Sequence, residues 1–253
     1  MREVDQALAR AFALRGRSEH ATVPPAPHHT LRQARSLDVE VRPVLAKPEW
    51  PSVVLSLERL HGDRFARAVE VLLNARDVDG LKVILFTSCH RAEGRTTLVL
   101  TLARALASQP GRTLLIDADL RAPMLARQLR LRPEVGLDDV IGLGRPLAEA
   151  LIAVEEPRLW LLPLRASVAK PRVFLASPAW TCTLARIRRE FDLVLIDGGP
   201  MFTGLSVALL HRSVDAAVLV YNPSITAERG LSRAREVLDA GGIPLLGVAE
   251  TFA

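Results

Sequence analysis

The chain has 253 residues, 49% of them apolar, which is enough for one sizeable α/β core and a tail. The net charge of +5 is modest, and the basic residues are scattered without interleaved aromatics, so no nucleic-acid partner is expected. Two cysteines form no disulfide framework and fit a reducing compartment. The sequence contains no signal-peptide core and no apolar run of about 18 residues. We therefore expect a cytoplasmic protein, peripheral at the inner face of a membrane only through a partner.

The first part of the chain differs in composition from the rest. Residues 1–15 place Leu8 and Phe12 on one helical face, which predicts a short amphipathic helix. Such a helix could dock on a partner or a membrane surface, or simply fray. Residues 16–51 are rich in proline and predict a largely disordered linker. A single folded domain is then expected over residues 52–253.

A helical pattern from Gly62 to Arg76 leads into the most informative stretch of the chain. The apolar run Val83 to Phe86 predicts a buried strand, a polar loop follows, and a second helix opens near Gly94. Strand, glycine-bearing loop, basic residue and paired threonines outline a phosphate-binding P-loop. Its backbone N–H groups and the positive end of the helix would point at one anion. The predicted nucleotide-binding residues here are Ala92, Glu93, Gly94, Arg95, Thr96 and Thr97.

Two positions depart from the P-loop pattern. Ala92 replaces a glycine, and Arg95 replaces the lysine. Arginine is a planar fork, whereas lysine is a compact charge that fits between β- and γ-phosphates. Losing one charge-assisted contact is worth roughly 1.5–3 kcal/mol, so turnover could vanish while binding persists. The exchange also follows the composition, because the 33 basic residues include no lysines besides Lys47, Lys82 and Lys170. An ordinary strand–turn–helix without a ligand is the alternative.

Cys89 lies inside the same loop. A thiol close to backbone N–H groups and a helix N-terminus can have a lowered pKa and be oxidisable. The alternative is that a small residue simply fits a tight turn.

Two further predicted strands end in carboxylates. The strand beginning at Thr113 leads to Asp117 and Asp119, and the strand that follows Phe191 leads to Asp197 and a Gly-Gly-Pro turn. At the carboxyl edge of a parallel sheet, such groups can hold Mg²⁺ and polarise a nucleophile. A turn or a helix cap is the alternative for the pair at 117 and 119. The second strand has the form of a Walker B strand, whose carboxylate reaches Mg²⁺ through water.

The remaining pattern alternates strands and helices. We expect helices over residues 136–141, 147–153, 180–190, 205–211 and 228–240, strands over 159–164, 216–221 and 244–248, and a loop over 171–178. Regular alternation predicts an α/β fold with a doubly wound, mostly parallel sheet flanked by helices.

With these stretches in this order, the chain resembles the bacterial tyrosine kinases of capsular and exopolysaccharide synthesis, within the MinD/ParA-like P-loop ATPases. The likeness covers roughly residues 62–250. It is most specific over residues 114–123, Leu-Leu-Ile-Asp-Ala-Asp-Leu-Arg-Ala-Pro, which resemble the second Walker motif of that family. Residues 136–141 and 192–197 match as well.

The resemblance implies ATP and Mg²⁺ as cofactors. Thr96, Asp117 and Asp197 would hold the metal, and Arg121 would lie near the phosphates or a facing subunit. The implied catalytic groups are Arg95, Asp117, which assists the metal, and Asp119, which receives the incoming hydroxyl. A membrane protein of polysaccharide chain-length control or export would be the partner, and self-association is left open.

Three departures from the family pattern weigh against autokinase chemistry. Arg95 stands where the family has its catalytic lysine. The last residues, 250–253, contain no tyrosine, and Tyr221 lies on a predicted buried strand, so phosphorylation of a tyrosine tail is not expected. Residues 67–74 lack the Glu-x-x-Arg-x-x-Arg oligomerisation motif.

Three functions remain open on these grounds. The chain could be a P-loop ATPase or tyrosine-kinase-like enzyme with weak activity, which the retained carboxylates favour. It could be an inactive pseudokinase scaffold that couples a chain-length partner to polysaccharide synthesis, which Arg95 favours. A MinD/ParA-like positioning ATPase is the third, and the scattered charge adds nothing for it.

Overall fold

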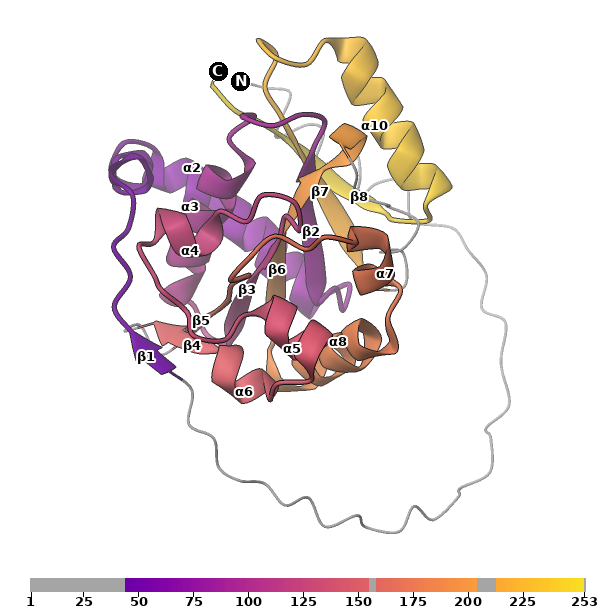
Figure 1. Cartoon of the computed structure of the whole chain (residues 1–253). Coiled ribbons are helices and arrows are strands. Elements are labelled where there is room, and N and C mark those ends of the chain that lie inside the picture. The colour runs from indigo at the N-terminus through magenta and orange to yellow at the C-terminus, as the bar shows by residue number, and fades with distance from the viewer. Residues whose placement is uncertain (1–43, 155–157, 204–212, 253) are drawn as a thin grey trace, which may run out of the picture.

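A computed structural model describes residues 44–154, 158–203 and 213–252, which form helices on both faces of one central sheet (Figure 1). Within these residues the sheet has eight strands in the order β1-β4-β5-β3-β6-β2-β7-β8. The strands are β1 (Val44–Ala46), β2 (Val83–Ser88), β3 (Thr113–Ala118), β4 (Ile152–Val154), β5 (Leu159–Leu162), β6 (Leu193–Pro200), β7 (Ala216–Tyr221) and β8 (Leu245–Glu250). Paired strands run parallel apart from β4 and β5. The predicted doubly wound, mostly parallel sheet is confirmed.

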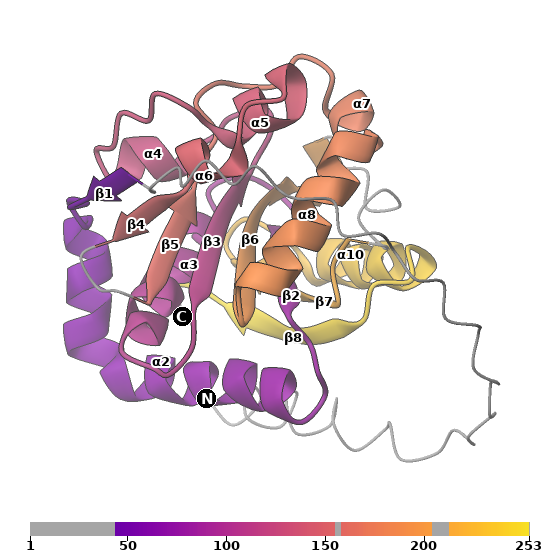
Figure 2. The same ribbon diagram turned by 90° about the horizontal axis from the view of Figure 1, so that it is seen from below.

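Two helical layers cover the sheet. The helices are α2 (Ser52–Asp77), α3 (Arg95–Ala107), α4 (Leu125–Gln128), α5 (Leu137–Leu143), α6 (Leu147–Ala150), α7 (Pro171–Leu175), α8 (Pro178–Glu190) and α10 (Glu228–Ala240), with a 3₁₀ turn η1 (Met201–Thr203). One core lies between the sheet and α2, α3 and α4, and the other lies under α5 to α8 and α10. Figure 2 shows α2 and α3 on one side of the sheet and α5 and α8 on the other.

The central strand β2 explains this layering. Its six residues are all buried, and successive side chains face opposite cores: Val83 and Leu85 enter one, Ile84 and Phe86 the other. A strand that is apolar on both faces must be covered on both, which a parallel sheet with crossover helices provides.

Helix α2 begins at Ser52, ten residues before the predicted start at Gly62. The backbone leaves helical geometry at His61, with φ of −133°. Between Ser52 and this kink, Val54 is the one residue of the helix that is buried. The first part of the helix therefore shows no buried apolar repeat like that of the later turns, from which the helix was predicted.

Three short segments differ from the predictions. Residues 44–46, assigned to the linker, pair with β4 as the edge strand β1, and residues 152–154 form β4 instead of continuing a helix. The predicted loop over 171–178 contains α7, with Pro171 in its first turn. Elements this short carry too few residues to show a period.

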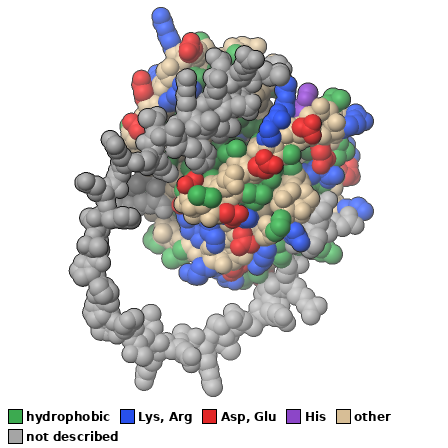
Figure 3. All heavy atoms as spheres, turned by 180° about the vertical axis from the view of Figure 1, so that it is seen from behind, with side chains coloured by type: hydrophobic (Ala, Val, Ile, Leu, Met, Phe, Trp, Pro, Cys, Tyr) green, Lys and Arg blue, Asp and Glu red, His purple; other side chains and the backbone are tan. Residues whose placement is uncertain are grey.

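Two predicted helices, over residues 1–15 and 205–211, lie outside the described residues, as does most of the linker. No helix among the described residues is long and apolar enough to cross a membrane. On the face seen in Figure 3, basic and acidic side chains are interspersed with apolar ones.

Candidate functional site

The predicted phosphate-binding loop connects β2 to α3. Ser88 ends the strand, and Arg95 is the first residue of a 13-residue helix. Gly94 at the N-cap has a left-handed φ of 76°, and a Cβ there would lie 3.2 Å from the Phe252 ring, so glycine is required for conformation and space. Because Gly94 has no side chain to cap the helix, the N–H groups of the first turn can bind an external anion.

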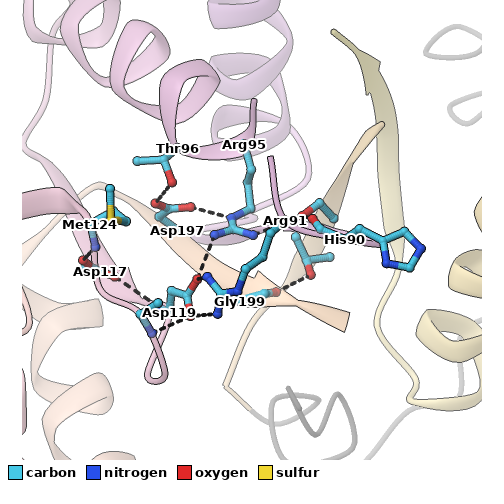
Figure 4. A network of polar contacts seen from close by, with 12 residues as sticks. His90, Arg91, Arg95, Thr96, Asp117, Asp119, Met124, Asp197 and Gly199 are labelled. Atoms are coloured by element: carbon cyan, nitrogen blue, oxygen red, sulfur yellow. Dashed lines mark hydrogen bonds and ion pairs between the residues drawn. The ribbon is translucent and has the colours of Figure 1, made fainter. Parts of the chain in front are cut away.

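Arg95 turns its guanidinium toward carboxylates at neighbouring strand ends (Figure 4). Nε donates to Oδ1 of Asp197 at 2.7 Å, Nη1 to Oγ of Ser88 at 3.0 Å, and Nη2 to Oδ2 of Asp119 at 3.3 Å. The arginine side chain is only 9% exposed. Burial opposes the charged form, but the charge of Asp197 and the hydrogen bond to it outweigh burial and raise the pKa of Arg95.

Thr96 and Asp197 form the second contact of the site. Oγ1 of Thr96 donates to Oδ2 of Asp197 at 2.7 Å, so Asp197 bridges the first two residues of α3. Asp117 is the register partner of Asp197 across β3 and β6. The structure thus brings together the three residues predicted to hold a metal.

Asp119 lies just beyond β3 and is held by a residue that the sequence reasoning missed. Arg91, in the loop, donates to both oxygens of Asp119, at 2.9 and 3.3 Å. The side chain of Arg91 is 45% exposed, so this pair reaches from the buried network to the surface. Motif reasoning assigns no role to this loop position, and only the fold brings it to the end of β3.

Asp117 is buried and serves the backbone. Its oxygens accept hydrogen bonds from the N–H groups of Asp119, Met124 and Leu125, which hold the turn after β3 and the start of α4. Burial, and next the negative charge of Asp197, raise the pKa of Asp117 to about 7, against the opposing effect of these backbone hydrogen bonds.

The loop is also fastened to β7 and β8. The buried Glu93 carboxylate accepts from the N–H of His90 at 2.8 Å and of Asn222 at 3.3 Å. Oγ1 of Thr251 donates to the carbonyl of Glu93 at 2.8 Å. Glu93 therefore contacts its own loop and the end of β7. Asn222 and Thr251 were not singled out by the sequence, because they follow strands without a recognisable motif.

The other predicted phosphate contacts lie around this loop. Ala92 is exposed with a left-handed φ of 63°, which suits the glycine that the P-loop pattern places there. Thr97 is half-buried in the first turn of α3, and Arg121 is exposed in the turn after β3. Their roles toward phosphate stay predictions.

Of the two interpretations of Cys89, the structure favours a small buried residue in a tight turn over an oxidisable thiol. The side chain is buried, and burial, followed by the nearby Glu93 charge, raises the pKa of the thiol to about 11. A thiol that stays protonated is a poor nucleophile and is slow to oxidise. The favourable N–H environment is outweighed by loss of water.

The arrangement described presents no free set of ligands for Mg²⁺ at Asp197. Hydroxyl and carboxylate oxygens such as those of Thr96 and Asp197 are the atoms that Mg²⁺ prefers. However, Arg95 and Thr96 already occupy the two oxygens of Asp197. Among the described residues, no group of three His, Cys, Asp or Glu side chains is placed to hold a metal ion by itself.

A buried strand, an uncapped helix N-terminus and aspartates in the carboxyl-terminal halves of β3 and β6 define the architecture of a P-loop nucleoside triphosphatase. No protein-family model matches the chain. Over 171 residues it is 28% identical to the tyrosine-protein kinase CpsD of Streptococcus pneumoniae, covering 67% of this chain and 75% of that protein. Over 168 residues it is 30% identical to the tyrosine-protein kinase YwqD of Bacillus subtilis, covering 66% of this chain and 70% of that protein. A 120-residue stretch, 46% of this chain, is 32% identical to 15% of the succinoglycan biosynthesis transport protein ExoP of Rhizobium meliloti.

Solved structures give the same result for the fold. The chimerical protein CapA2B2 superposes with a TM-score of 0.72 at 22% identity, covering 83% of this chain and 93% of that one. The kinase domain of VpsO superposes with a TM-score of 0.66 at 26% identity, covering 74% of this chain and 95% of that one. The MinD protein of Pyrococcus horikoshii, complexed with Mg-ADP, superposes with a TM-score of 0.55 at 24% identity, covering 66% of this chain and 68% of that one. The chain belongs to the bacterial tyrosine-protein kinase family.

Proposed function

We propose that this chain is a nucleotide-binding regulator of capsular or exopolysaccharide synthesis that transfers phosphate poorly compared with lysine-bearing P-loop enzymes. Binding is supported by the uncapped N-terminus of α3 and by the loop fastened against β7 and β8. Poor transfer is supported by one observation above all, the position of the Arg95 guanidinium.

Arg95 carries this proposal because its contacts engage the groups that phosphoryl transfer would need. A P-loop lysine reaches the β- and γ-phosphates and stabilises charge that develops during transfer. Arg95 instead donates to Asp119 and Asp197. Asp119, the predicted acceptor of the incoming hydroxyl proton, also accepts from Arg91, so its oxygens are engaged unless both arginines move.

The strand order indicates where the nucleoside would lie. The carboxylates lie toward the carboxyl ends of β3 and β6, on one side of β2, so the terminal phosphates would point that way. The base and sugar would then extend to the other side, toward β7 and β8. There the Phe252 ring, 74% exposed, lies next to Gly94 and offers a face for stacking on the base.

The proposed partner follows from the relatives. The similarity to ExoP, a succinoglycan biosynthesis transport protein, supports a membrane chain-length or export protein as the partner of this chain. The chain would then work in the cytoplasm and reach the membrane's inner face through that partner. Self-association stays a prediction.

Calorimetric titration of ATP and ADP into the wild type and Asp117→Ala tests nucleotide binding. A micromolar Kd, equivalent to about −8 kcal/mol, is expected for the wild type. Asp117→Ala should bind more weakly because the turn after β3 loses its anchor. Absence of heat with the wild type would contradict nucleotide binding.

A second candidate, weak ATPase or protein-kinase activity, is favoured by the assembly of Asp117, Asp119 and Asp197 at one sheet edge. Steady-state ATP hydrolysis separates the two candidates. Turnover by the wild type well above that of Asp119→Ala would favour the enzyme, and equal background rates in both would favour the regulator.

A further inference from the structure

Two of the three buried carboxylates of the site are paired with guanidinium groups of the protein itself. Asp119 and Asp197 are nearly fully buried, and Arg91 and Arg95 are paired with them at 2.7 to 3.3 Å. The third carboxylate, Asp117, has backbone N–H groups as its hydrogen-bond donors. Buried charges are tolerated when they are paired and hydrogen-bonded. Asp119 and Asp197 therefore meet this condition without a metal ion.

The hydrogen bonds of the site are complete. Both oxygens of each of the three carboxylates, Asp117, Asp119 and Asp197, accept at least one hydrogen bond from the protein. The donors are the side chains of Arg91, Arg95 and Thr96 and the backbone N–H groups of Asp119, Ala122, Met124 and Leu125. A Mg²⁺ ion could reach Asp197 only by displacing Arg95 or Thr96. Displacing Arg95 would leave a buried guanidinium without its main partner, which is strongly unfavourable.

The guanidinium has donors left for a ligand. It carries five N–H groups, and the three contacts to Asp197, Ser88 and Asp119 use three of them. Among contacts within the described residues, two N–H groups of Arg95 therefore remain to donate to a phosphate oxygen. A lysine in the same place is a point charge and cannot span three acceptors in a plane.

Building on the nucleotide-binding function proposed above, we infer that Arg95 serves as a permanent counter-ion in place of the divalent cation. The ligand is then the metal-free nucleoside polyphosphate, and Mg²⁺ competes with Arg95 for Asp197 instead of assisting binding. If Arg95 only reflected the arginine-rich composition of the chain, its side chain would need no specific partners. It instead makes three specific buried contacts.

Calorimetric titration of ADP in EDTA and in Mg²⁺ tests this inference on the wild type alone. The Kd in EDTA should be no higher than the Kd in Mg²⁺, because Mg²⁺ takes up free ADP and competes with Arg95 for Asp197. A loss of tenfold or more in EDTA, about 1.4 kcal/mol, would overturn the inference while leaving nucleotide binding intact. Absence of ADP binding in both conditions would overturn the proposed function and the inference with it.

Arg95→Lys is the matched variant, since it keeps the charge and removes the planar fork that contacts Asp119 and Asp197 together. Mg²⁺ should strengthen ADP binding to this variant by about tenfold or more. Arg172→Lys, at an exposed position on α7, controls for the exchange itself and should behave as the wild type. If Mg²⁺ left ADP binding unchanged in Arg95→Lys as well as in the wild type, Arg95 would not be the cause, and its proposed role would be contradicted.

Thermal unfolding without nucleotide gives a second readout that does not depend on ADP. Mg²⁺ should leave the Tm of the wild type unchanged relative to EDTA, because its carboxylates are already paired. The Tm of Arg95→Lys should rise in Mg²⁺. A Tm of the wild type that rises with Mg²⁺ as much as that of the variant would show a metal site that Arg95 does not block.

Discussion

An arginine–aspartate cluster lies at each end of the central strand β2, and the two differ in what the aspartate does. At the start of the strand, Asp215 accepts from the N–H groups of Lys82 and Val83 and from both Nη atoms of Arg188. At the other end, Asp197 accepts from two side chains of the phosphate-binding loop, Arg95 and Thr96.

Burial and partners decide the role of each cluster. The Arg188 and Asp215 side chains are 31% and 22% exposed, and the carboxylate fixes the backbone where strands begin. The Arg95 and Asp197 side chains are 9% and 2% exposed, and their pairing joins a helix start to two strand ends. The first cluster holds the fold together, and the second places charge where a ligand would bind. Substitutions at the two ends should therefore have different consequences.

Removing the aspartate should lower the free energy of unfolding more at the carboxyl end of β2 than at its start. Asp197→Ala removes the shortest ion pair of the buried Arg95 and leaves it the Ser88 hydroxyl and the longer contact to Asp119, so the unfolding free energy should fall by about 3–5 kcal/mol. Asp215→Ala should cost less, about 1–3 kcal/mol, because Arg188 can turn into water. Urea unfolding monitored by circular dichroism measures both. Equal losses would contradict the distinction between the clusters.

The pH dependence of stability should also differ between the ends. The folded pKa of Asp117 is raised from 3.8 to about 7, so its contribution is complete below pH 3.8 and is lost as the pH rises through about 7. Burial acts to raise the pKa of Asp215, but the hydrogen bonds from Arg188, Val83 and Lys82 outweigh it and lower the pKa. The contribution of Asp215 is therefore present above pH 3.8 and is lost as the pH falls below that value.

Urea unfolding across pH 3 to 8, compared with Asp117→Asn and Asp215→Asn, checks both signs. Asp117→Asn should remove the loss of stability on the neutral side, and Asp215→Asn the loss on the acid side. A wild-type curve that keeps rising through neutral pH would be incompatible with the raised pKa of Asp117.

A smaller effect is expected at the edge of the site. Phe252→Ala should weaken nucleotide binding by about 1–3 kcal/mol if the exposed ring stacks on the base. Stability should change little, because the ring is largely in water. Titration of ADP, with the exposed Ile225→Ala as a matched apolar control, measures this. If Phe252→Ala lowered the stability of the protein but not its affinity for ADP, Phe252 would lie outside the nucleotide site.

The cysteines should have the smallest effect on nucleotide binding. Cys182 is exposed and Cys89 is buried with a pKa near 11, so a thiol reagent should label Cys182 quickly and Cys89 only on unfolding. Cys89→Ser should leave nucleotide binding under mild oxidation unchanged. Rapid labelling of Cys89 in the folded protein would restore the idea of an oxidisable loop.

The sequence predicted the parts of this structure that carry long, regular signals. The apolar runs of β2, β3 and β6 and the aspartates that follow them gave the sheet and the site edge, because parallel strands end together. The start of α2 was not predicted because its residues before His61 bury Val54 alone and show no buried apolar repeat, and β1, β4 and α7 are too short to show a period.

Pairings between distant residues could not be predicted in the same way. Arg91 and Asp119 are 28 positions apart, and Arg95 and Asp197 are 102 apart. The positions of Arg95, Asp119 and Asp197 at one site were predicted, but not which carboxylates the guanidinium would contact. That choice depends on side-chain reach and burial, which a linear pattern does not contain.

Single-turnover hydrolysis of bound ATP by the wild type and Arg95→Lys, side by side, distinguishes an arginine that prevents phosphoryl transfer from one that catalyses it. Both proteins should retain ATP, the wild type should hydrolyse it no faster than Asp119→Ala, and Arg95→Lys should hydrolyse it faster in Mg²⁺. Rapid hydrolysis by the wild type, lost in Arg95→Lys, would show instead that the arginine is a catalytic group and that this chain is an active phosphotransferase.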